Sequence, residues 1–278
     1  MQILRGGVNS CDCVDFEEFT GRAFADALKV SMTQSRSKSA LVYVHGFANS
    51  FKDAAFRTAQ FAYDLADEKY DVVPVLFSWP SDPDRVNYVG AADRAWSAGQ
   101  QLAAFLEQVT ATTGAGVVHI VAHSKGAQVL LFALDAIQVS NLMVVGKDGK
   151  NLVPRFNQIV LAAPDIRVID FSSLVLPAVA SQHGVTNYVS SNDAALKASK
   201  RANAGARAGD SGSTAIIVRG VETIDVTAVN YRPGGHSSFA DSARVIADIR
   251  ELLSGKTPAE RRLPRVPRLD LGYWLLED

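Results

Sequence analysis

The chain has 278 residues, 47% hydrophobic and 21% charged, which is enough to bury the core of one large domain or two small ones. Its formal net charge of −1 provides no basic field for nucleic acid or an anionic membrane, so neither is expected as a partner. No run of about 18 apolar residues occurs, which predicts that no segment spans a membrane.

Residues 1–38 precede the first clear strand and are expected to form an N-terminal extension. They begin without the charged segment and apolar run of a signal peptide, so we expect a cytoplasmic protein unless a leader has been removed. Cys11 and Cys13 have no second cysteine pair and no histidine nearby in the sequence. We therefore expect neither a metal site nor a cofactor.

From about residue 40, short β-rich runs alternate with longer helical patterns, as in the βαβ units of a parallel sheet. Helices are expected between the strands, and a last helix is expected to begin just after His236. This pattern predicts an α/β domain over residues 39–255, with helices on both faces of a mostly parallel sheet and no large cap domain. The strands are predicted at residues 40–44, 72–77, 117–122, 158–163, 185–190 and around 223–226.

Three further segments interrupt or follow this rhythm. Residues 202–213 are rich in alanine and glycine and are predicted to form a mobile loop, and residues 141–154 are predicted to form a surface excursion. The tail, residues 256–278, ends in an apolar stretch around Trp274. We expect this tail to dock on the domain or on a partner, and the sequence leaves the oligomeric state open.

Ser124 is the candidate nucleophile. It lies in the middle of Ala-His-Ser-Lys-Gly at residues 122–126, between a mainly apolar strand and an amphipathic helix. A nucleophile elbow needs small residues two positions before and after the serine, and Ala122 stands where glycine is usual. A serine that merely caps the following helix is the simpler interpretation. The helix-cap interpretation is disfavoured because a second motif, His-Gly-Phe at residues 45–47, follows the first strand. In folds with a nucleophile elbow, this position supplies the second donor of the oxyanion hole.

His236 is the candidate general base. It follows the last predicted strand in the loop Arg-Pro-Gly-Gly-His, residues 232–236, whose glycines allow an imidazole to reach over the elbow. His45 is a weaker candidate for the base, because its place after the first strand indicates a residue that braces the loop. His119 lies inside an apolar strand, which is typical of a core histidine.

Two aspartates could be the third member of the catalytic set. In proteins with a nucleophile elbow, the acid lies between the serine and the histidine in the sequence. Asp193 follows the predicted strand nearest to the histidine loop, and it is the favoured candidate. Asp165 follows the strand before it and is the alternative acid. Whichever aspartate is not the acid is expected to cap a helix, since each precedes a possible helix start.

The remaining site residues surround this set. The backbone N–H groups of Phe47 and Lys125 are the expected donors of the oxyanion hole, and the Lys125 side chain is expected at the surface or the pocket rim. His45, Trp79 and His123 are expected to border the substrate. For Trp79, a role as a packed anchor of its loop is equally open.

Several sequence blocks together resemble bacterial α/β-hydrolases of the esterase/lipase superfamily, in particular a poorly characterised family within it. This resemblance covers about residues 40–250 and implies an α/β-hydrolase fold with a Ser/His/Asp set. The chain departs from the family habit at Lys125, where an apolar residue such as methionine is more usual. The matching blocks are residues 42–51, 75–81, 122–126, 161–165 and 188–193.

The resemblance implies ester hydrolysis as the default reaction. We therefore expect hydrolysis of a small-molecule carboxylic ester, with short to medium acyl chains, through an acyl-enzyme on Ser124. A lactonase or amidase with the same residues is the nearest alternative. A catalytically idle hydrolase-fold binding protein is the alternative from a different class.

Overall fold

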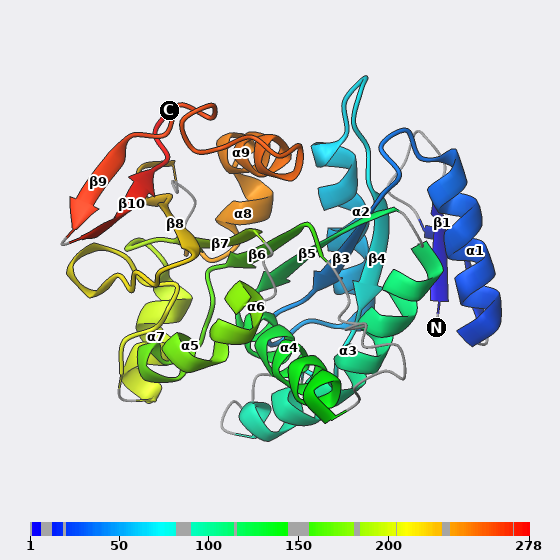
Figure 1. The fold of residues 1–278 in the computed structure, drawn as a ribbon, viewed down its shortest axis with the longest axis horizontal. Coiled ribbons are helices and arrows are strands. Elements are labelled where there is room, and N and C mark those ends of the chain that lie inside the picture. Colours follow the sequence, from blue (N-terminus) through cyan, green and yellow to red (C-terminus); the bar gives the residue numbers. More distant parts are fainter. Residues whose placement is uncertain are drawn as a thin grey trace.

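The computed structural model describes most of the chain and builds it around an eight-stranded sheet (Figure 1). The described residues are 2–6, 13–18, 21–81, 90–113, 116–143, 156–180, 184–203, 205–229, 234–268 and 270–278. The strands of this sheet are β3 (Ser39–Val44), β4 (Val73–Phe77), β5 (Val117–His123), β6 (Gln158–Ala162), β7 (Gly184–Val189), β8 (Val221–Asp225), β9 (Arg265–Arg268) and β10 (Leu271–Leu275).

The sheet has the strand order β4-β3-β5-β6-β7-β8-β10-β9. Every neighbouring pair is parallel except β9 and β10, which are antiparallel. Parallel pairs need long crossovers, and helices supply them here. The predicted mostly parallel sheet is therefore confirmed.

The helices cover both faces of the sheet, as Figure 1 shows with α8 and α9 above it and α3 and α4 below it. Helix α1 packs beside α3, where the rings of Phe24 and Phe105 lie 5.9 Å apart. The helices are α1 (Gly21–Gln34), α2 (Phe51–Leu65), α3 (Ala91–Thr113), α4 (Lys125–Met143), α5 (Val168–Leu174), α6 (Leu176–Ala180), α7 (Ala194–Ala202), α8 (Ser238–Asp241) and α9 (Ala243–Leu253).

Two hydrophobic clusters sandwich the sheet, and the alternation of side chains along each strand separates them. On β3, Val42 and Val44 belong to the cluster between the sheet and helices α3 and α4. Leu41 and Tyr43 belong to the cluster between the sheet and helices α2 and α9. Because both faces are covered, the strands carry apolar residues at nearly every position. This burial explains why the strands are readable as continuous apolar runs.

The C-terminal tail adds two strands to the sheet. β10 pairs in parallel with β8, and Leu276 just after it is fully buried. Ahead of these strands, the Arg261 guanidinium donates to the buried Asp248 carboxylate on α9 at 2.8 Å and also pairs with Glu222 of β8. The boundaries predicted for the extension, the domain and the tail stay a prediction.

The structure corrects two expectations about loops and helices. The segment 202–213 was expected to be mobile, but Arg207 and Ala208 are buried, and the Asn187 amide donates to the Ala208 carbonyl at 3.0 Å. The last predicted helix is two helices, because Ser242 begins α9 as its N-cap. From residue 144 on, the excursion predicted at 141–154 lies outside the described residues.

Outside the main sheet, β1 (Gln2–Gly6) and β2 (Cys13–Glu18) form a separate antiparallel pair. None of the helices in the described ranges is both long enough and apolar enough to cross a membrane.

Candidate active site

The candidate residues gather at one edge of the sheet, where the parallel strands have their carboxyl ends. His45 follows β3 and Ser124 follows β5. Asp193 follows β7, and His236 lies in the connection from β8 to α8. Residues far apart in the sequence therefore meet because their strands run in the same direction.

Ser124 occupies a sharp turn between β5 and α4. Its φ of 54° is in the left-handed region, which costs a non-glycine residue energy and marks a functional turn in many proteins. Its N–H donates to the Ala162 carbonyl at 2.9 Å, which ties the turn to β6. Gly126 is required because a Cβ there would lie 2.4 Å from the His45 carbonyl oxygen and 2.5 Å from that of Val44.

Two hydrogen bonds join Ser124, His236 and Asp193 in a chain. His236 Nε2 lies 2.7 Å from Ser124 Oγ, and His236 Nδ1 lies 2.6 Å from Asp193 Oδ2. A carboxylate only accepts hydrogen bonds, so Nδ1 carries the proton and Nε2 accepts from the serine hydroxyl. This is the arrangement in which an imidazole can remove the serine proton.

Asp193 is almost fully buried and has a second partner. Its Oδ1 accepts a hydrogen bond of 2.9 Å from the Leu196 N–H, so the same side chain caps α7 and faces His236. The N-terminal end of a helix favours a negative charge. These contacts orient the carboxylate toward the imidazole.

Asp165, the alternative acid, has other partners. Ser199 Oγ donates to Asp165 Oδ1 at 2.6 Å, and Arg207 Nε lies 3.4 Å from the same oxygen. The Asp165 backbone N–H donates to the Ser124 carbonyl at 3.1 Å. Asp165 does not cap a helix, because the N-cap of α5 is Arg167, so the expectation that the non-acid aspartate is a cap is wrong.

Lys125 is buried, with 7% of its surface exposed, which excludes the expected position at the surface, while the alternative at the pocket rim stays a prediction. Burial lowers the pKa of its amine, and the negative charge of Asp165 opposes that shift. Lys125, Asp165 and Arg207 thus form a buried charged group beneath the elbow. The sequence signal for it was the pairing of an unusual lysine in the elbow with an arginine in the segment 202–213.

The turn after β3 lies directly against the elbow. A Cβ on Gly46 would be 3.0 Å from Ser124 Cβ, so glycine permits this approach. Asn49 Nδ2 donates to the carbonyls of Gly46 and Phe47 at 3.2 and 3.0 Å, which holds the turn in shape. Lys125 begins α4, so its backbone N–H lies at the N-terminal end of this helix, directly after Ser124.

His45 and Trp79 brace this turn from behind. His45 Nδ1 donates to the Gly46 carbonyl at 2.9 Å, and Nε2 accepts from the Trp79 backbone N–H at 3.1 Å. The Trp79 indole N–H donates to the His45 carbonyl at 2.7 Å. Burial lowers the pKa of His45 to about 4, so the imidazole is neutral near pH 7. Their predicted contact with substrate stays a prediction.

His123 is buried between two rings from the other end of the chain. Its Nε2 lies 2.8 Å from the His236 backbone oxygen, and its ring centroid is 4.7 Å from that of His236 and 4.5 Å from that of Phe239. The role of His123 at the substrate stays a prediction. A hydrogen bond to the backbone of the base was not foreseen.

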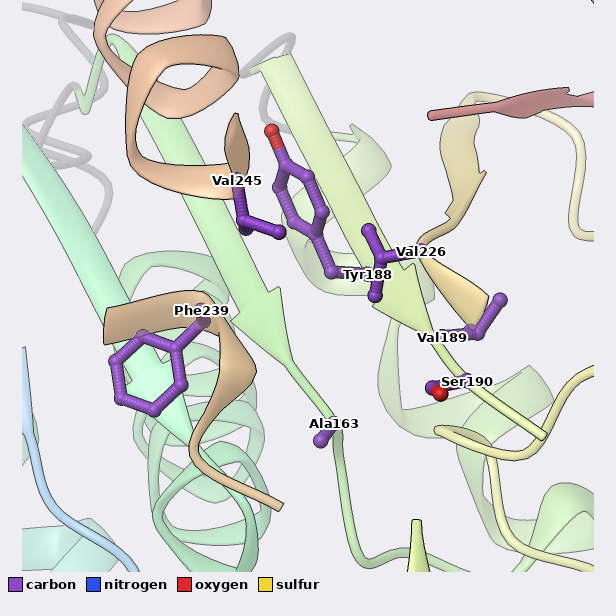
Figure 2. Close-up of a pocket in the computed structure, with 7 residues that line it drawn as sticks. All are labelled: Ala163, Tyr188, Val189, Ser190, Val226, Phe239 and Val245. Atoms are coloured by element: carbon purple, nitrogen blue, oxygen red, sulfur yellow. The ribbon is translucent and has the colours of Figure 1, made fainter. Parts of the chain in front are cut away.

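Two hollows lie near these residues. A groove of about 660 Å³ borders the turn after β3 and is lined by Asn49, Ser50, Phe51, Ser78, Trp79, Pro80, Ser81 and Arg94. A cavity of about 10 Å³ lies between the ends of β6 and β7 and helices α8 and α9, and its lining includes Phe239, Tyr188 and Val245 (Figure 2). This second space holds about one water molecule and is too small for a substrate.

Comparison with known proteins gives one family match. The family model described as "Alpha/beta hydrolase of unknown function (DUF900)" matches residues 21–255, which include every candidate site residue. A search among curated proteins found no match. Among solved structures, the chain is similar to one titled "Crystal structure of ESTFA (FE-lacking apo form)". The identity is 11% and the TM-score 0.41, over 87% of this chain and 93% of that chain.

Proposed function

We propose that this chain, which belongs to the family of alpha/beta hydrolases of unknown function, cleaves carboxylic esters through an acyl-enzyme on Ser124. The observation that carries the proposal is the pair of hydrogen bonds, 2.7 and 2.6 Å long, that links Ser124 to His236 and His236 to Asp193. A serine hydroxyl needs such a base to become a nucleophile at neutral pH.

In the first step, His236 Nε2 takes the Ser124 proton while Oγ attacks the ester carbonyl carbon. The carbonyl oxygen becomes an oxyanion, which the N–H groups of Phe47 and Lys125 stabilise together with the N-terminal end of α4. His236 then donates its proton to the departing alcohol. Water then attacks the acyl carbonyl carbon while His236 Nε2 takes its proton. The bond from that carbon to Ser124 Oγ breaks, the carboxylic acid leaves, and His236 returns the proton to Ser124 Oγ.

Asp193 is the proposed acid because it is the aspartate that contacts His236. Its buried carboxylate keeps the Nδ1 proton in place and stabilises the imidazolium that forms during the reaction. Asp165 instead accepts from Ser199 and pairs with Arg207, which gives it a supporting role beneath the elbow.

The proposed substrates are esters with short to medium acyl chains. The groove along Trp79 and Asn49 adjoins the turn that carries Phe47, one of the two proposed oxyanion donors, and it opens to solvent. Within the described residues no large cap covers the carboxyl edge of the sheet (Figure 1). Lactones and amides would react by the same steps, so they belong in the same substrate panel.

The test is hydrolysis of p-nitrophenyl esters of graded acyl length by the wild type and by Ser124→Ala. We expect Ser124→Ala to lose nearly all turnover, because it removes the hydroxyl that His236 Nε2 contacts. Ser172→Ala, an exposed serine on α5, is the matched control and should retain full activity. Turnover by Ser124→Ala equal to that of the wild type would overturn the proposal, as would equal labelling of both by a fluorophosphonate probe.

A further inference from the structure

We infer that His123 is a positioning residue, whose side-chain N–H holds the backbone of the His236 loop against the strand that carries the nucleophile. This inference rests on the proposed function and adds to it a residue that acts through His236. The observation behind it is the 2.8 Å contact between His123 Nε2 and the His236 backbone oxygen.

The direction of this hydrogen bond follows from its partners. A backbone carbonyl only accepts, so His123 Nε2 carries the proton and donates. His123 Nδ1 is directed toward Gly46, where a Cβ would lie only 3.1 Å away. The imidazole therefore fills the space between the turn after β3 and the loop of the base, with its donor aimed at that loop.

Two backbone tethers flank the imidazole of the base, and each leads to a different partner. The His236 carbonyl is bound by His123, the last residue of β5, which directly precedes Ser124. The Gly234 carbonyl accepts a 2.9 Å hydrogen bond from the N–H of Ala194, which directly follows Asp193. The loop is thus tied to the element of the nucleophile on one side and to the element of the acid on the other.

Packing holds the His123 ring in the position that this hydrogen bond needs. Phe239 of α8 is buried and lies 4.5 Å from the ring of His123, centroid to centroid. Phe239 also packs against Phe61 and Tyr43, with centroids 5.8 and 6.2 Å away. The His123 imidazole therefore packs against the hydrophobic core. Its Nε2–H cannot rotate away from the His236 carbonyl without disrupting the contact with Phe239.

Electrostatics keep His123 in the neutral form that donates from Nε2. Burial lowers the pKa of His123 well below its ordinary value and the nearby His236 lowers it further, whereas the hydrogen bond to the His236 carbonyl opposes this shift. A neutral His123 adds no repulsion when His236 becomes charged during the reaction. It can therefore hold the base in place in both protonation states of His236.

The consequence for catalysis is a loss of alignment when the donor is removed. His123→Met keeps a side chain of similar length but donates no hydrogen bond, so the His236 carbonyl loses its partner. A displacement of the base by about 1 Å would lower kcat by about 100-fold with little change in KM. His123→Gln places an amide N–H near the position of Nε2 and should recover at least about tenfold of that loss.

The experiment measures kcat, KM and the rate of fluorophosphonate labelling for the wild type, Ser124→Ala, His123→Met and His123→Gln, with thermal unfolding as a check on folding. His123→Asn, whose amide is one methylene shorter and falls short of the carbonyl, replaces the Met variant if that one unfolds. We expect the fluorophosphonate probe to label His123→Met or His123→Asn slowly. In His123→Gln, both kcat and the labelling rate should recover substantially.

The outcomes separate the positioning role of His123 from the proposed function. If the wild type is labelled at Ser124 and the Met or Asn variant matches its kcat, the positioning role is wrong and the proposed function stands. Equal loss in the Gln and Met variants would likewise overturn it, because the hydrogen bond would then be irrelevant. No labelling of the wild type at Ser124 overturns the proposed function and the positioning role together.

Discussion

Gly126→Ala should abolish most activity while leaving the chain folded. The added Cβ would lie 2.4 Å from the His45 carbonyl oxygen, which is 1.0 Å short of the 3.4 Å at which ordinary contact begins. Because the obstructing atom belongs to the backbone, no side chain can rotate to relieve the contact. Either the elbow or the turn after β3 must move by about 1 Å.

A shift of that size separates the proposed nucleophile from the proposed oxyanion donors. Misplacement by about 1 Å commonly costs about 100-fold in rate, so kcat for a p-nitrophenyl ester should fall by about that factor. Overpacking of this kind also costs about 1–3 kcal/mol of stability, which urea unfolding would measure. The two readouts together separate a distorted site from an unfolded chain.

Gly205→Ala is the matched control, since a Cβ on Gly205 meets no heavy atom within 4 Å. It should keep both the activity and the stability of the wild type. If Gly126→Ala retained the wild-type kcat, the close approach of the elbow to His45 would have no part in catalysis, and the reasoning from this contact would be refuted.

Three further predictions follow from buried polar contacts. Asp193→Asn should lower kcat by about 10⁴-fold because the amide favours the wrong tautomer of the base, whereas Asp165→Asn should lower it far less. Burial lowers the pKa of His119 to about 4 from its ordinary 6.5. The unfolding free energy should therefore fall by up to about 3 kcal/mol as the pH drops from 6.5 to 4. His119→Gln should remove this pH-dependent contribution to the unfolding free energy. Arg261→Met should cost about 3–5 kcal/mol in urea unfolding, because it leaves the Asp248 carboxylate buried without its guanidinium.

Controls and contrary results differ among the three. A larger loss of kcat in Asp165→Asn than in Asp193→Asn would reverse the choice of acid. For the histidine, an unchanged slope of stability against pH in His119→Gln would show that its protonation is not linked to unfolding. Arg262→Met, at an exposed neighbouring position, should be near neutral, and an equal loss from both arginine variants would refute the role of the buried pair.

Local sequence patterns alone determined the α/β architecture and the identity of the candidate serine and histidine. Parallel strands buried on both faces must be apolar, so their runs were visible at residues 40–44 and 117–122 without any structure. The elbow requires small residues around Ser124, and that requirement is also local. Hydrogen bonds between strands and helices far apart in the chain leave no such pattern.

Only the tertiary structure decided which aspartate lies against His236, because both candidates follow strands at the same edge. Asp193 faces the imidazole since it begins α7 beside the histidine loop, whereas Asp165 turns toward Ser199 and Arg207. The same is true of His123, whose contact with the His236 backbone joins residues 113 positions apart. Sequence patterns report the structure of a few neighbouring residues. Which side chains meet at the edge of the sheet depends instead on how the strand ends pack together.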